Sequence, residues 1–345
     1  MTQSRRQFLS GAVTAAAIAS ASADATAAPA GDGELEKKVV AEFSRLPGKN
    51  ALKFWAPAAD GRAEWSATLN PETPLFCGSS FKVFVLTEYL RQREGEPGEI
   101  KKRLAEELVL DESVFSPSSP VFNPPNLSGK VTALTVLEAM IVHSDNTATD
   151  MALKHAGADK VRQFVSSIGL RDARIPTSTR QFFGYIVGDP EWRTLTWPKI
   201  ARNLADEKSP YQTRPIINDV ETMVCSPRDF VSFYARALHG EFFKNKETTD
   251  IFRAILSRSD SVAGSMPLGV SGFAKGGSIE FANDRVMCIA GGMWAARRWV
   301  YFALITNAED KELTPKYIQA ARTIFAMVNE GLGRVENHVA KVSAR

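Results

Sequence analysis

The chain has 345 residues, of which 44% are hydrophobic and 23% charged, and its formal net charge is +3. This composition excludes a disordered or fibrous protein, and the balanced charge argues against nucleic acid as a partner. Three cysteines are too few for a disulfide-stapled scaffold. We expect Cys77, Cys225 and Cys288 to be mostly buried thiols, with at least one unpaired.

The N-terminus has the pattern of an export signal. Ser4-Arg5-Arg6-Gln7-Phe8-Leu9 precedes an apolar run over residues 11–19, which is followed by Ala-x-Ala steps that suit cleavage after Ala27. The arginine pair resembles a twin-arginine signal, which implies a periplasmic or secreted protein. The alternative of a membrane anchor is weaker, because the apolar run is far shorter than the roughly 20 residues that a span needs. We therefore predict a signal over 1–27 and a single catalytic unit over 28–345.

The elements expected after the signal begin with a helix from Asp32, which ends at Pro47-Gly48. Two strands joined by an Asp60-Gly61 turn and a helix from Ser79 follow. Apolar periodicity and strand-forming residues indicate the other elements: helices over 132–143, 158–168 and 226–238, strands over 52–58, 63–69, 272–279, 285–293 and 298–306, and a last helix from 314.

This order predicts an α/β (α+β) fold built on a five-stranded antiparallel sheet, with N- and C-terminal helices covering it. The α/β lobe would comprise about residues 32–78 and 250–335. An all-helical lobe would occupy about 79–249 and would contain an extended, proline-rich loop over 171–224.

Three short motifs carry the chemistry. Ser79 and Lys82 are three residues apart, so they share one face of a helix. A serine hydroxyl needs a base to become a nucleophile, and a desolvated lysine can supply one. Ser-x-x-Lys alone is weak, because a capping serine near a surface lysine gives the same letters. The second and third motifs are Ser144-Asp145-Asn146 and Lys275-Gly276-Gly277-Ser278.

The three motifs in this order resemble those of class A β-lactamases and penicillin-binding proteins. The resemblance implies that Ser79 forms an acyl-enzyme with Lys82 as base or proton relay, and that Ser144 passes a proton to the leaving group. It implies that Asn146 holds Lys82 and the substrate, while Lys275 attracts a substrate carboxylate. The oxyanion hole would be the N–H groups of Ser79 and Ser278.

The resemblance also implies roles for three flanking residues. Gly277 would line the substrate site, and Arg285, on the next strand, would bind a substrate carboxylate or simply lie on the sheet surface. Asp145 is interpreted as structural.

The sequence departs from the class A pattern at two places. No glutamate occurs from Thr147 to Pro190, where class A enzymes carry the base that activates the deacylating water. We considered Asp189 and Glu191 as replacement bases, with solvated loop charges as the alternative. In the third motif, Gly276 stands where a hydroxyl residue is usual, which removes a hydrogen bond to a substrate carboxylate.

Three functions remain open from the sequence. The first is an exported serine hydrolase that cleaves a β-lactam or a related amide or ester. Its substrate would be a small acyl compound that carries a carboxylate. The second is a penicillin-binding-like protein that deacylates slowly, and the third is a non-catalytic binding protein on the same fold. None of them requires a cofactor or a metal, and the oligomeric state is left open.

Overall fold

A computed structural model describes residues 32–205 and 211–343, with side chains described up to residue 333. The signal predicted over 1–27 therefore lies outside the described residues. Within the described part of the chain, no helix is both long enough and apolar enough to cross a membrane.

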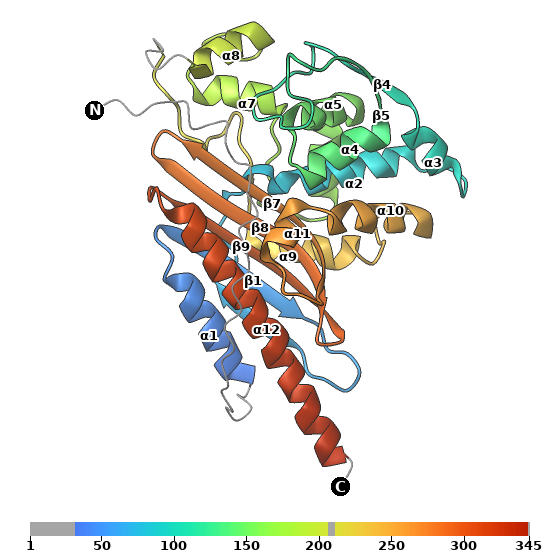
Figure 1. The fold of residues 1–345 in the computed structure, drawn as a ribbon, viewed down its shortest axis with the longest axis vertical. Coiled ribbons are helices and arrows are strands. Elements are labelled where there is room, and N and C mark those ends of the chain that lie inside the picture. The colour runs from blue at the N-terminus through green and yellow to red at the C-terminus, as the bar shows by residue number, and fades with distance from the viewer. Residues whose placement is uncertain (1–31, 206–210, 344–345) are drawn as a thin grey trace.

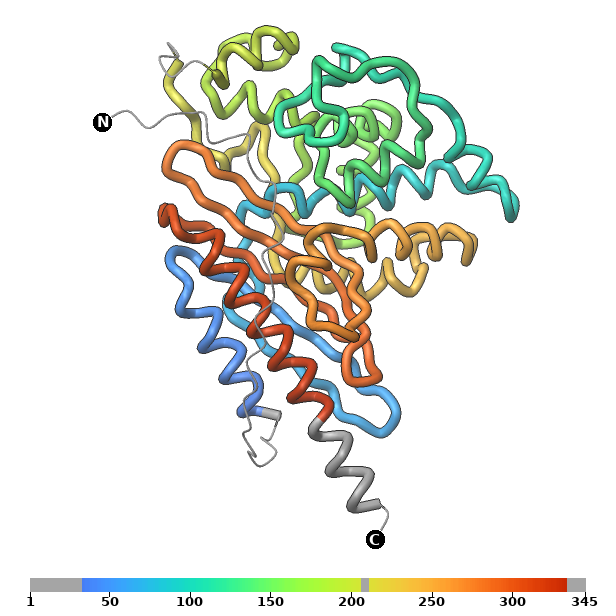
Figure 2. Tube along the Cα trace, in the orientation of Figure 1, coloured from blue at the N-terminus to red at the C-terminus, as the bar shows by residue number. Residues whose placement is uncertain are grey.

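The central sheet confirms the predicted fold. Its five strands run in the order β2-β1-β9-β8-β7, and all neighbours are antiparallel. The strands are β1 (Lys49–Ala56), β2 (Trp65–Leu69), β7 (Ser271–Phe281), β8 (Asp284–Ala295) and β9 (Arg298–Ala308). In Figure 2 the trace leaves the sheet after β2 and returns to it only at β7, so one sheet joins two distant parts of the sequence.

Side chains that alternate along β9 separate two cores. Phe302 and Leu304 face the terminal helices α1 (Asp32–Ser44) and α12 (Leu313–Ser343), which cover one face of the sheet (Figure 1). Ala303 and Ile305 belong to the core on the opposite face, together with residues of α9 (Pro227–Ala237). The sheet is thus buried on both faces. The third motif lies on its edge strand β7, which contacts the turn that carries Ser79.

The inserted lobe is mostly helical, but it is not all-helical as predicted. The strands β4 (Glu107–Leu110) and β5 (Gly129–Thr132) pair as a ribbon beside its helices. The helices of the lobe and its border are α2 (Lys82–Arg93), α3 (Glu99–Leu104), α4 (Ala133–Val142), α5 (Asn146–Ala156), α6 (Ala158–Ser167), α7 (Thr179–Ile186), α8 (Trp197–Ala205), α10 (Lys246–Ser257) and α11 (Asp260–Ser265). A short apolar run and a β-branched run cannot be separated from helix by pattern alone, which explains the missed ribbon.

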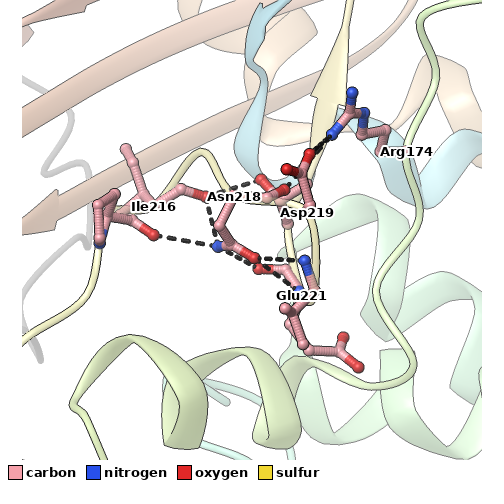
Figure 3. A network of polar contacts seen from close by, with 8 residues as sticks. Arg174, Ile216, Asn218, Asp219 and Glu221 are labelled. Carbon is pink, nitrogen blue, oxygen red and sulfur yellow. Dashed lines mark hydrogen bonds and ion pairs between the residues drawn. The ribbon is translucent and has the colours of Figure 1, made fainter.

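The segment 171–224 holds more order than its prolines suggest, because it contains α7 and α8 and a turn organised by Asn218 (Figure 3). The Asn218 side chain accepts hydrogen bonds from the backbone N–H groups of Val220 and Glu221 at 2.9 and 2.8 Å. Beside it, Arg174 forms an ion pair with Asp219 at 2.8 Å. The turn leads directly into β6 (Val224–Cys225), which pairs with β3 (Leu75–Phe76) just before the first motif.

Candidate active site

The first motif is held in place by backbone pairing on both sides. Asn307 of β9 accepts from Phe76 N–H and donates to Phe76 C=O, both at 2.9 Å, so one side chain mimics a strand partner for β3. Cys77 N–H donates to Met223 C=O at 2.9 Å. The chain then enters the 3-10 turn η2 (Gly78–Phe81), which places Ser79 half-buried at the head of α2.

Lys82 connects the first motif to the second. Its ammonium donates to the Ser144 carbonyl at 2.6 Å and to Asn146 Oδ1 at 2.7 Å, and it lies 3.3 Å from Ser144 Oγ. Asn146 in turn donates from Nδ2 to Pro117 C=O at 2.8 Å, which fixes its amide orientation. The structure thus brings Lys82 of the first motif into contact with Ser144 and Asn146 of the second.

The turn that carries Ser144 depends on Asp145, the residue interpreted as structural. Asp145 caps α5 by accepting from Ala148 N–H at 2.8 Å, and its second oxygen accepts from Val121 and Phe122 N–H at 2.9 Å each. Ser144 itself has a positive φ of 60°, a conformation uncommon for a residue with a side chain. Both carboxylate oxygens of Asp145 thus accept backbone hydrogen bonds that hold the loop, in agreement with a structural role.

Burial lowers the affinity of the Lys82 amine for a proton compared with that of an ordinary lysine. Its side chain is fully buried, and desolvation, helped by the nearby charge of Lys275, holds the pKa of Lys82 well below its usual value. The carboxylates of Asp145 and Asp150 oppose this effect. A lysine with a lowered pKa has a larger neutral fraction, which is the form that can accept a proton.

The third motif lies directly against the first. A Cβ atom built on Gly277 would come within 2.7 Å of Ser79 N, and one built on Gly78 would come within 2.9 Å of Ser278 N. Only residues without a side chain permit this approach of β7 to η2. The close backbones place the Ser79 and Ser278 N–H groups, the predicted oxyanion hole, at one junction. Ser80 Oγ reinforces it by donating to Lys275 C=O at 3.1 Å.

Lys275 adds a second buried ammonium. It is 2% exposed and donates to Gly276 C=O at 2.7 Å. Burial lowers the pKa of Lys275 to about 7, while the negative charge of Asp260 acts in the opposite direction. Near neutral pH, Lys275 is therefore present in both its charged and its neutral form.

The comparison with known families decides the assignment, because residues 34–328 match the model of the β-lactamase enzyme family. The chain belongs to that family. No curated protein matches the sequence at a significant level.

Several solved structures have a similar fold. A class A β-lactamase from Bacteroides cellulosilyticus DSM 14838 is 16% identical with a TM-score of 0.64, covering 88% of this chain and 98% of that one. The TLA-1 extended-spectrum β-lactamase is 14% identical with a TM-score of 0.67, covering 88% and 100%. PBP-A is 19% identical with a TM-score of 0.61, covering 86% and 96%.

Arg285 does not join the β-lactamase-like site as the resemblance implied. It pairs across the hairpin with Glu280, five residues beyond Lys275, roughly 16 Å along the strand. Its guanidinium donates to the carbonyls of Ala282 and Asp284 at 3.1 and 2.9 Å. The β7–β8 hairpin is long, so the ten-residue spacing that suggested Arg285 leads to the hairpin tip and corrects that expectation.

Asp189 and Glu191, the two predicted replacement bases, both face α8. Asp189 is fully buried and accepts from Asn203 Nδ2 at 2.7 Å and from Lys199 Nζ at 3.3 Å. Glu191 is exposed and forms an ion pair with the same Lys199. The contacts described for the two carboxylates tie the α7–α8 connection together, and none of them reaches Ser79 or Lys82.

The polar contacts between α7 and Asn146, a partner of Lys82, involve residues that motif reasoning missed. Thr179, the first residue of α7, donates or accepts at three groups: Asp150 Oδ1 at 2.7 Å, Ser116 Oγ at 2.8 Å and Asn146 C=O at 3.3 Å. Asp150 also accepts from Thr179 N–H at 2.6 Å. Desolvation raises the pKa of Asp150 to about 6. The signal was available, since Asp150 is one helical turn after Asn146 and shares its face of α5.

Proposed function

We propose that this protein is an exported serine hydrolase of the β-lactamase type that forms an acyl-enzyme on Ser79 and hydrolyses it slowly. The observation that carries the proposal is the buried Lys82 ammonium, bonded at 2.6 and 2.7 Å to the second motif and one helical turn from Ser79. A structural lysine gains little from such a desolvated position, whereas a proton acceptor with a lowered pKa requires it.

Acylation follows from these groups. Ser79 Oγ attacks the carbonyl carbon of an amide or ester, and its proton passes to neutral Lys82. The negative charge that develops on the carbonyl oxygen is stabilised by the N–H groups of Ser79 and Ser278. When the C–N or C–O bond breaks, Ser144 gives its proton to the leaving group and recovers one from Lys82. Lys275 attracts a carboxylate on the substrate.

Within residues 32–205 and 211–333, no carboxylate is placed as an equivalent base for deacylation. Release of the acyl group requires a water molecule that loses a proton as it attacks the ester carbon. Helix α7, over residues 179–186, has no Asp or Glu. Asp150 is fully committed, since its two oxygens accept from Thr179 and from Arg180 N–H at 3.0 Å. This favours slow turnover, so a penicillin-binding-like activity is the second candidate function.

The test uses three compounds on the protein without residues 1–27: a fluorescent penicillin, a chromogenic cephalosporin and a short acyl ester. We expect covalent label on the wild type, slow release of product, and no label on Ser79→Ala. Ser257→Ala, an exposed serine on α10, is the control and should be labelled like the wild type. Label that persists without turnover supports the penicillin-binding activity, and full activity of Ser79→Ala in any assay contradicts the mechanism.

Export by the twin-arginine pathway is part of the same proposal and rests on the pattern of residues 1–27. Replacing Arg5 and Arg6 together by lysine keeps the charge but removes the arginine pair. We expect the full chain to shift from the periplasmic or culture fraction to the cytoplasm. An unchanged distribution would contradict this pathway.

A further inference from the structure

Position 276 of the third motif lacks a hydroxyl in the sequence, but the structure places the hydroxyl of another element beside it. A Cβ atom built on Gly276 would overlap the hydroxyl of Ser261 and lie 3.1 Å from Ser261 Cβ. Ser261 belongs to α11, which packs against β7. The space that a serine or threonine side chain at Gly276 would fill is therefore already filled by a serine hydroxyl.

The position of Ser261 is fixed from both sides. Its own N–H donates to the capping residue Ser259 at 3.4 Å, at the start of α11. The preceding Asp260 carboxylate lies in hydrogen-bond contact with Nδ1 of His143 at 3.0 Å, and His143 directly precedes Ser144. This contact ties α11 to the turn of the second motif, so Ser261 keeps its place between two parts of the active site.

The Ser261 hydroxyl is available to a ligand. In the described part of the chain it makes no hydrogen bond, and its side chain is half-buried at the free edge of the sheet, where β7 has no strand neighbour. Lys275 precedes Gly276 on β7, its ammonium donates to Gly276 C=O, and the negative charge of Asp260, the residue before Ser261, acts on the pKa of Lys275. A neutral O–H donor beside an ammonium suits an anionic group such as a carboxylate, which accepts from both.

We propose that Ser261 is a substrate-binding residue that donates a hydrogen bond to the carboxylate of the substrate and so takes over the role vacant at Gly276. This inference rests on the proposed function, because it concerns the same acylation on Ser79. It makes Ser261 a determinant of specificity for carboxylate-bearing over neutral acyl compounds.

The experiment compares acylation rates for a labelled penicillin and for its neutral methyl ester. Ser261→Ala should lower the rate with the penicillin roughly ten- to a hundredfold, because a hydrogen bond to a charged group is lost. The rate with the methyl ester should change less than about twofold. Ser265→Ala, on the last residue of α11, is the matched control and should leave both rates unchanged.

A serine–glycine exchange sharpens the test. Gly276→Ser alone should lower both rates, since its new Cβ overlaps the Ser261 hydroxyl. Combining it with Ser261→Gly removes the overlap, keeps the amino-acid composition, and should restore much of the preference for the carboxylate. Thermal unfolding of each variant shows whether a loss comes from folding.

Two results would overturn the inference while leaving the proposed function intact. One is equal loss of both rates in Ser261→Ala with normal thermal stability. The other is a loss of carboxylate preference in Ser278→Ala instead, since the exposed Ser278 hydroxyl is the rival donor on the same face of β7. If neither compound labels the wild type, the proposed function itself fails, and the role of Ser261 in acylation fails with it.

Discussion

Two walls of the site differ in how they depart from the family pattern. The β7 wall, formed by β7 and α11, lacks the motif hydroxyl at Gly276 but holds the Ser261 hydroxyl in the same space. The α7 wall, formed by α5 and α7, lacks the loop glutamate, and Thr179 with Asp150 occupies its inner surface.

The contrast separates the two half-reactions. In the proposed function the β7 wall would serve substrate binding and acylation, and there the Ser261 hydroxyl would replace the missing one. The α7 wall would serve deacylation, and there the described polar groups Asp150 and Thr179 are hydrogen-bonded to each other, which leaves neither of them free as a base. A protein that lacks the deacylating group on the α7 wall but keeps the binding groups on the β7 wall would acylate well and turn over slowly.

The largest expected effect tests the base that both walls share. Lys82→Ala should lower the acylation rate roughly a hundred- to ten-thousandfold with both the penicillin and its methyl ester, since general base catalysis contributes that much. Lys102→Ala, an exposed lysine on α3, is the control. Stopped-flow measurement of labelling checks the rates, and an unchanged rate in Lys82→Ala would exclude it as the base.

The second prediction adds the missing chemistry to the α7 wall. Thr179→Glu places a carboxyl group on the α7 residue that contacts Asn146, and Asp150→Asn removes the buried like charge beside it. The double variant should lose its covalent label roughly tenfold faster or more. Gln181→Glu, which adds the same charge two residues along α7, should not. If the double variant and the wild type released the label equally fast, the α7 wall would not be where deacylation is limited.

The smallest expected effect concerns the charge on the β7 wall. A lysine with a pKa lowered to about 7 is charged below that pH and loses its charge as the pH rises through it. The ratio of acylation rates for the penicillin over its methyl ester should therefore fall, by up to about tenfold, between pH 6 and pH 9. The ratio cancels the opposite pH dependence of Lys82. Lys275→Arg should flatten it, and a flat wild-type profile would contradict the role of Lys275.

Much of this molecule could be predicted from its sequence, for identifiable physical reasons. The strands around Phe302 and the helix from Thr314 have strong periodicity, and both are where the pattern indicates. Lys82 and Asn146 also lie where the motifs predict, at the starts of α2 and α5, and Lys82 contacts both Ser144 and Asn146.

The errors arise where tertiary register or packing decides. Arg285 was placed by counting residues from Lys275, but hairpin length determines which residues face each other. The sequence offers Asp189 and Glu191 either as replacement bases or as loop charges, and it does not show that Lys199 of α8 contacts both. Ser261 had no sequence signal, because only the packing of α11 on β7 brings it to Gly276.

The pairing of Asn307 with Phe76 also sets the order in which the active site can be assembled. The strand that leads into Ser79 is completed by a side chain near the end of the folded chain. We therefore expect the segment that leads into Ser79 to be fully paired only after β9 has left the ribosome. Nascent chains that stop before residue 307 contain all three motifs, and we expect them to fail to acylate. Acylation would then require a chain whose sheet is complete.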